Sequence, residues 1–163
     1  MKEALIQIRR FKPADGGLVL GPRPGKKSKA AMANMGLTHV CTLLHKGEGP
    51  AAIERIAVEL GCSWVWLPVA GASLETLGAL DIESMVVQLA RATAKAALPR
   101  VYLHCSAGIH RTGFFASLLL RLQPLSVGDI PIALAALRPI TAQEVGSDRI
   151  ALEVSRADAL QGS

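Results

Sequence analysis

Residues 100–122 constrain the fold of this chain more than any other stretch. A short apolar run at residues 100–103 leads into the loop His104-Cys105-Ser106-Ala107-Gly108-Ile109-His110-Arg111-Thr112-Gly113. An apolar pattern with helical spacing then continues over residues 114–122. The pattern predicts a strand, a tight loop and a helix, with Cys105 opening the loop and Arg111 closing it six positions later.

The composition of this loop is that of an anion-binding site. Backbone N–H groups at a helix N-terminus hold an anion, and together with the helix dipole they stabilise a thiolate. Cys105 would then lie beneath a bound phosphate as a nucleophile, and Arg111 would donate two N–H bonds to the phosphate. Gly108 lets the backbone turn without a Cβ clash. Thr112 could donate its hydroxyl to the sulfur when a phospho-cysteine breaks down.

The stretch from His104 to Thr112 resembles the signature of the cysteine-dependent protein tyrosine and dual-specificity phosphatases. That signature is His-Cys, five residues, Arg, and then Ser or Thr. The Ala-Gly that the family prefers stands here at Ala107 and Gly108. A bare Cys-x5-Arg pattern is weak, whereas the whole motif between a strand and a helix is specific.

The resemblance implies a role for each residue of the loop. It makes Cys105 and Arg111 catalytic, and Thr112 a supporting residue. It also implies that His104 orders the loop by hydrogen bonding and helps to lower the pKa of the thiol. The implied phosphate-binding residues are Ser106, Ala107, Gly108, Ile109, His110 and Arg111. No His/Cys/Asp cluster has metal-ligand spacing, so neither a metal nor a cofactor is expected.

The rest of the chain alternates strands with helices. Strands are predicted at residues 18–20, 38–44, 63–67 and 100–103, with an edge strand at residues 4–10. Helices are predicted at residues 28–35, 51–60, 80–97, 112–122, 130–138 and 147–160. This order predicts one α/β domain over residues 1–163, with a mostly parallel sheet flanked by helices. Pattern-level similarity to a dual-specificity phosphatase domain covers about residues 18–155.

One carboxylate of the family is missing from its usual place. The family has an aspartate general acid two or three residues after a strand-ending Pro-Val, and this aspartate protonates the departing oxygen. Here that segment reads Leu67-Pro68-Val69-Ala70-Gly71-Ala72-Ser73-Leu74-Glu75. The identity of the general acid is therefore open.

Three side chains are candidates for this acid. Asp81 could reach the site if its loop folds over it, but it is also a natural cap for the following helix. Glu75 lies on the loop where the family has its aspartate, a few positions after the usual place. Its other interpretation is a solvent-facing carboxylate. His110 could donate a proton at neutral pH, or it could shape the rim of the pocket.

Charge and aromatic content indicate which classes of partner the protein could bind. The net charge of +5 favours acidic ligands in a general way. The basic run of Arg23, Lys26, Lys27 and Lys29 either steers an anionic substrate or is a solvated helix start. Aromatic residues are scarce, which makes nucleic acid a weakly supported partner.

No apolar run reaches the length of a membrane span, so no membrane partner is expected. Three cysteines without paired spacing argue against a disulfide framework, and Cys41 and Cys62 are expected to be packed thiols. A reducing cytoplasm is therefore the expected location.

The expected activity is hydrolysis of a phosphoric monoester through a phospho-cysteine intermediate. A phosphorylated protein is the leading substrate, which corresponds to a protein-tyrosine or dual-specificity phosphatase. The alternative is a non-protein phosphate, such as an RNA 5′ end, a nucleotide or a phosphoinositide, because an absent aspartate matters less for anhydrides. A further alternative is a catalytically weak module that binds phosphate. The oligomeric state is left open.

Overall fold

The computed structural model describes residues 1–162. Within these residues the sheet has the order β1-β4-β2-β3, and all of its strand pairs are parallel. The strands are β1 (Leu18–Gly21), β2 (His39–Thr42), β3 (Ser63–Trp66) and β4 (Val101–His104). The predicted α/β class, a parallel sheet flanked by helices, is confirmed.

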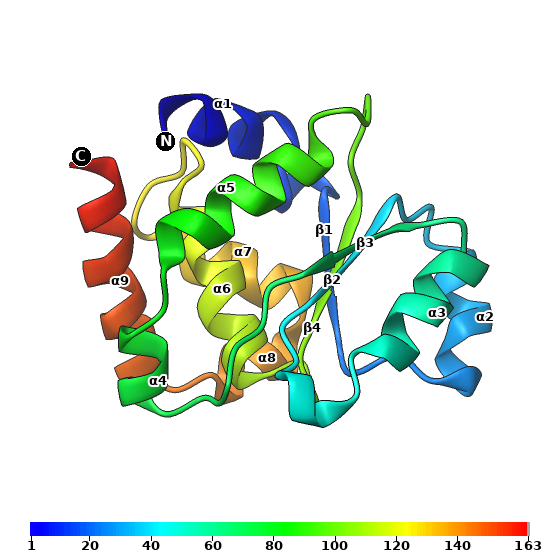
Figure 1. Ribbon diagram of the computed structural model, residues 1–163. Coiled ribbons are helices and arrows are strands. Elements are labelled where there is room, and N and C mark those ends of the chain that lie inside the picture. The colour runs from blue at the N-terminus through cyan, green and yellow to red at the C-terminus, as the bar shows by residue number, and fades with distance from the viewer. Residues whose placement is uncertain (163) are drawn as a thin grey trace.

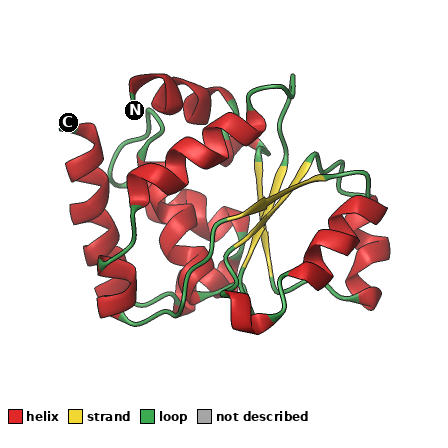
Figure 2. Cartoon of the chain, in the orientation of Figure 1, coloured by secondary structure: helices red, strands yellow, loops and turns green. Residues whose placement is uncertain are grey.

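Helices cover both faces of the sheet (Figure 1, Figure 2). One face carries α2 (Lys26–Ala33) and α3 (Ala51–Glu59). The other face carries α1 (Lys2–Arg10), α4 (Leu74–Gly78), α5 (Ile82–Thr93), α6 (His110–Arg121), α7 (Asp129–Leu137), α8 (Pro139–Glu144) and α9 (Ser147–Gln161). Two 3₁₀ turns, η1 (Pro13–Asp15) and η2 (Lys46–Glu48), lie in the connections. Within residues 1–162, no helix combines the length and hydropathy needed to cross a bilayer.

Side chains of the central strands alternate between two cores. Cys41 and Leu103 contribute to the larger core, which also contains residues of α5 and α6. Val40 and Tyr102 contribute to the smaller core with residues of α2 and α3. This alternation follows from the period of two along a strand, and it explains why β2 and β4 are buried along their whole lengths. Their carboxyl ends are thereby held side by side at one edge of the sheet.

Helix α6 is the buried centre of the larger layer. Every residue from Arg111 to Leu120 is buried, and the helix packs against α7 and α9. Glu153 of α9 is fully buried and accepts hydrogen bonds from Ser117 at 3.0 Å and from Arg121 at 2.8 Å. A buried carboxylate needs such partners, so these bonds fix α9 against α6. The loop that leads into α6 is therefore anchored at its carboxyl end by a rigid helix.

Three elements differ from the sequence prediction. Residues 4–10 belong to α1, so the predicted edge strand is wrong. Ala4 and Ile8 are one helical turn apart and both are buried, and α1 packs on α5 instead of extending the sheet. The prediction also missed α4, and it missed α8, which has Pro139 at its first position, where proline is well tolerated.

Candidate active site

The loop from Cys105 to Ile109 connects the carboxyl end of β4 to the start of α6, as the sequence predicted. A cavity of about 290 Å³ opens at this loop. It is lined by Cys105, Ser106, Ala107, His110 and Arg111, together with Glu48, Ala70, Gly71 and Ala72. The structure thus gathers five of the sequence-predicted residues around a hollow that can hold an anion.

Cys105 is 3% exposed, and hydrogen-bond donors surround its thiol. Thr112 Oγ1 donates to Sγ at 3.2 Å. Burial opposes ionisation of the thiol, but the hydroxyl of Thr112 and the backbone N–H groups of Thr112, Ile109 and Gly108 outweigh it. The net effect lowers the pKa of Cys105 below its usual value. The thiolate is therefore stabilised before any substrate binds.

This lowered pKa predicts rapid alkylation of Cys105 by iodoacetamide at neutral pH. The midpoint of the rate-against-pH curve should lie below that of a free cysteine. Thr112→Val should move it upward, because the sulfur loses one donor. Peptide mass spectrometry measures the reaction. Cys41, whose pKa burial raises to about 12, should stay unmodified as the internal control. Equal midpoints for the wild type and the Thr112→Val variant would contradict the assignment.

His104 is fully buried and bonded to the backbone of the loop. Its Nδ1 lies 2.9 Å from the carbonyl oxygen of Cys105, which can only accept, so Nδ1 carries the proton. Burial lowers the pKa of His104 to about 4, so the ring is neutral near pH 7 and Nε2 accepts from Thr42 Oγ1 at 2.8 Å. Trp64 Nε1 donates to the same hydroxyl at 2.9 Å. This chain of donors holds the ring, and with it the start of the loop.

The outward-facing carbonyl groups of the loop are bound from the α7–α8 junction. Arg138 Nη1 donates to the carbonyl oxygens of Ala107 at 3.0 Å and Gly108 at 2.8 Å. Thr141 Oγ1 also donates to the Gly108 oxygen, at 2.6 Å. These bonds hold the loop from its outer side, while the backbone N–H groups of Gly108 and Ile109 bond to the Cys105 sulfur. Arg138 ends the helix predicted at residues 130–138, and nothing in its sequence pattern assigned it to the site.

Gly108 packs against the end of β1 with no space for a side chain. It has a φ of +70°, and a Cβ atom would lie 2.1 Å from the carbonyl oxygen of Gly21. Gly36 has almost the same φ, +68°, but faces open space. The two glycines therefore share the backbone requirement and differ in the close contact.

Gly108→Ala is expected to destabilise the fold by more than about 3 kcal/mol, against about 1–2 kcal/mol for Gly36→Ala. The control carries only the cost of the left-handed backbone, whereas Gly108→Ala adds the clash with Gly21. Thermal unfolding of both variants measures the difference, and the melting temperature of Gly108→Ala should be lower by several degrees. Equal melting temperatures would show that the loop does not pack against β1 in this way.

Glu48 of η2 holds the guanidinium of Arg111. Arg111 Nη1 donates to Glu48 Oε2 at 2.7 Å and Nη2 donates to Oε1 at 2.9 Å, while Ser106 Oγ donates to Oε1 at 3.0 Å. The bond from Arg111 lowers the pKa of Glu48 to about 2, so the carboxylate is charged at neutral pH. The two-pronged bond that the sequence predicted for a phosphate is made here to a carboxylate of the same chain.

Glu48 lies between the strand predicted at residues 38–44 and the helix predicted at residues 51–60, and the sequence prediction did not assign it to the site. A signal was nevertheless present, because Glu48 follows closely after β2, the strand next to the one that delivers Cys105. Polar residues that follow adjacent parallel strands meet at the same edge of the sheet.

The three candidate acids lie in different places. His110 is exposed and lines the cavity with Cys105. Glu75 lies in α4 and lines a neighbouring cavity. Asp81 is the N-cap of α5, where its Oδ1 accepts from the backbone N–H of Ser84 at 3.0 Å. The capping interpretation of Asp81 is confirmed. Glu48 also lines the cavity at Cys105, but its low pKa makes it a poor proton donor.

The remaining cysteines lie in the cores. Cys41 is part of the larger core and Cys62 of the smaller one, as expected for packed thiols. Over residues 1–162, no group of three or more His, Cys, Asp and Glu side chains is arranged to hold a metal ion.

Solved phosphatase structures share this arrangement of strands and helices. Tk-PTP in its active form has a TM-score of 0.64 and 17% identity, over 89% of this chain and 94% of that chain. Kinase-associated phosphatase has a TM-score of 0.61 and 15% identity, over 94% of each chain. The core catalytic domain of the PP-IP phosphatase Siw14 from S. cerevisiae has a TM-score of 0.55 and 15% identity, over 90% of this chain and 89% of that chain. The chain has the fold of these phosphatases. No protein-family model matches it, and no curated protein matches its sequence.

Proposed function

We propose that this protein is a phosphoric monoester hydrolase that acts through a phospho-cysteine intermediate. The observation that carries the proposal is the Cys105 sulfur, which accepts hydrogen bonds from Thr112 and the loop N–H groups in a cavity that Arg111 also lines. The fold shared with Tk-PTP and kinase-associated phosphatase supports it. A reduced thiol is needed for this chemistry, so we propose a cytoplasmic setting.

In the proposed reaction the phosphate of the substrate binds against the loop N–H groups and Arg111, which stabilise negative charge on its oxygens. The Cys105 thiolate attacks phosphorus, and the S–P bond forms as the P–O bond to the leaving group breaks. Water then attacks phosphorus and releases inorganic phosphate and the thiolate. Thr112 donates its hydroxyl to the sulfur as this second step proceeds.

The proton for the leaving group is assigned to His110 in this proposal, because His110 lines the cavity and Asp81 is occupied as a cap. A general acid must carry a proton to act, so the group that donates to the leaving oxygen should produce the basic limb of the pH–rate profile. His110→Ala should remove this basic limb and lower kcat by about 10²-fold, whereas Asp81→Asn should leave the limb in place. An unchanged basic limb in His110→Ala would exclude the histidine.

We propose a phosphorylated protein, with phosphotyrosine foremost, as the substrate. One observation favours a second candidate, a non-protein phosphoanhydride of the nucleotide or RNA 5′-end type. The segment at residues 67–74 brings no carboxylic acid to the cavity, and an anhydride leaving group needs little protonation. One solved structure with this fold is named a PP-IP phosphatase, which supports keeping the second candidate.

A substrate panel tests both proposals. Its members are phosphotyrosine peptides, phosphoserine peptides, 5′-triphosphate RNA and inositol phosphates, with an aryl phosphate as the general probe. The highest kcat/KM is expected for phosphotyrosine peptides. A strong preference for the RNA or the inositol phosphates would replace the protein substrate. No turnover of the aryl phosphate at high enzyme concentration would identify a phosphate-binding module instead of an enzyme.

A further inference from the structure

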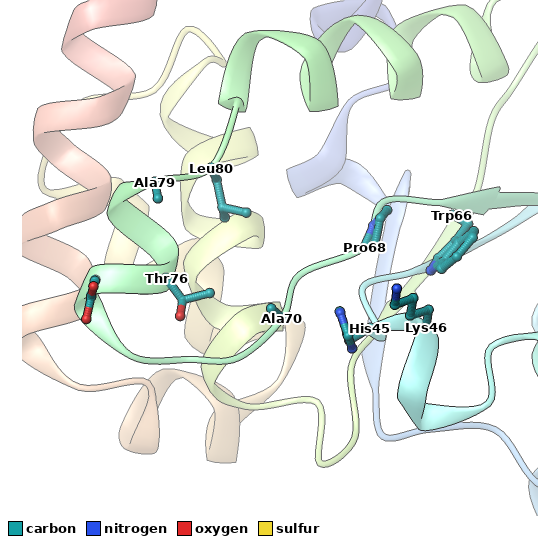
Figure 3. Close-up of a pocket in the computed structure, with 9 residues that line it drawn as sticks. His45, Lys46, Trp66, Pro68, Ala70, Thr76, Ala79 and Leu80 are labelled. Atoms are coloured by element: carbon teal, nitrogen blue, oxygen red, sulfur yellow. The ribbon is translucent and has the colours of Figure 1, made fainter.

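A second and larger cavity, of about 790 Å³, lies beside the catalytic one. Ala70 lines both cavities, which makes them neighbours. In Figure 3, His45 and Lys46 lie near Trp66 on one side, and Thr76, Ala79 and Leu80 face them from α4 and the turn after it. Ligand sites commonly have volumes of about 300–1,000 Å³, so this cavity is large enough for part of a substrate.

The 3₁₀ turn η2 contributes to the lining of both cavities. Lys46 and Glu48 are two residues apart in η2. Glu48 holds Arg111 in the catalytic cavity, while Lys46 lines the larger one. Two residues of a 3₁₀ turn are only about 4 Å apart along its axis. The adjoining part of a substrate whose phosphate binds near Arg111 can therefore reach the cavity that Lys46 lines.

His45 and Lys46, at the start of η2, form the wall of the larger cavity that carries positive charge and a free hydrogen-bond donor. Gly47 N–H donates to His45 Nδ1, so Nδ1 is the accepting nitrogen of the ring and Nε2 is its donor. Within the described residues, neither His45 Nε2 nor the exposed Lys46 Nζ has a hydrogen-bond partner. These groups are suited to bind a carboxylate of the substrate.

The adjoining wall is apolar and rigid. Trp66 is 36% exposed, and its ring stacks on Trp64 with centroids 5.9 Å apart. Its Nε1 is already used in a hydrogen bond to the carbonyl oxygen of Leu44 at 2.7 Å, so the face of the ring is left for apolar contact. Glu75, which also lines the cavity, opposes a densely anionic ligand.

We propose that this cavity, the flanking subsite, binds the residues next to the phosphotyrosine of a peptide substrate. An acidic side chain of the peptide pairs with Lys46 and His45, and an apolar side chain lies on Trp66. The inference rests on the proposed function and specifies its substrate as an acidic phosphotyrosine peptide. A peptide suits a site that combines two basic groups, one carboxylate and an apolar wall better than a polyphosphate does.

Two phosphotyrosine hexapeptides test the subsite. Both contain a leucine, and they differ only in having glutamate or lysine beside the phosphotyrosine. The wild type should prefer the glutamate peptide by about fivefold to tenfold in kcat/KM. Lys46→Glu should bring this ratio close to one or reverse it. Lys95→Glu makes the same charge change on an exposed residue near the amino end of β4, and it should retain the wild-type ratio.

Failure of this inference can be told apart from failure of the proposed function. Hydrolysis of an aryl phosphate, which is too small to fill the flanking subsite, reports the function alone. Calorimetric titration of Cys105→Ser with both peptides reports the binding preference without turnover, and adding Lys46→Glu should remove that preference. Equal affinity for the two peptides, or equal loss of the preference in Lys46→Glu and Lys95→Glu, would overturn the subsite.

Discussion

Cys105→Ser is expected to lower kcat for an aryl phosphate by more than about 10⁴-fold while inorganic phosphate still binds. A serine hydroxyl is not ionised by the same set of N–H donors, so the attacking group is lost, whereas Arg111 and the loop N–H groups, which we propose hold the anion, are retained. Steady-state kinetics and calorimetric titration with phosphate measure the two effects.

The matched control for this variant is Cys62→Ser, since Cys62 lies in the smaller core and does not line the cavity at Cys105. It should turn over the aryl phosphate at the wild-type rate once its folded fraction is checked by thermal unfolding. If Cys105→Ser kept a tenth or more of the wild-type kcat, the sulfur could not be the nucleophile.

Arg111→Lys is expected to lose both turnover and phosphate binding, with kcat/KM lower by at least about 10³-fold. The guanidinium donates to both carboxylate oxygens of Glu48 and also, at 3.0 Å, to the carbonyl oxygen of Val69. An ammonium is a point charge and cannot span these acceptors and a phosphate at once. The variant therefore loses the bonds that position the cation, and it also loses the ability to donate two parallel hydrogen bonds to the phosphate.

Arg91→Lys, at an exposed position of α5, is the control for Arg111→Lys. It preserves the same charge and should keep kcat/KM and the affinity for phosphate. Calorimetry with phosphate separates the two losses expected for Arg111→Lys. Full phosphate affinity in Arg111→Lys would show that the loop N–H groups alone hold the anion.

The loop could be predicted from the sequence because its chemistry is local. Cys105, Gly108 and Arg111 lie within seven residues, and a strand and a helix with clear apolar patterns enclose them. The parallel sheet was predictable for a similar reason, since buried strands that alternate with helices have few other arrangements.

The partners that hold the loop could not be predicted, because they are distant in the chain. Glu48 is 63 residues from Arg111, and Arg138 is 30 residues from Gly108. Only the folded sheet and the α7–α8 junction bring them together. Their residue types, an acid in a loop and a basic residue at a helix end, are also those of ordinary surface positions.

The error at the N-terminus has a different physical cause. In a short segment, the buried pair Ala4 and Ile8 fits a helix, but a strand with alternating side chains also places two such residues on one face. The choice depends on α5, which provides the surface on which α1 packs. The packing of α1 on α5, which cannot be read from the local sequence pattern, therefore determines that this segment is a helix.

Trapping the covalent intermediate tests the central claim most directly. The wild type is mixed with an aryl phosphate, quenched in acid within the first turnover, and digested for peptide mass spectrometry. The account predicts a burst of released phenol and a phosphate on the peptide that contains Cys105. A burst-free reaction with no phosphate on Cys105, or with the phosphate on another residue such as His110, would contradict it.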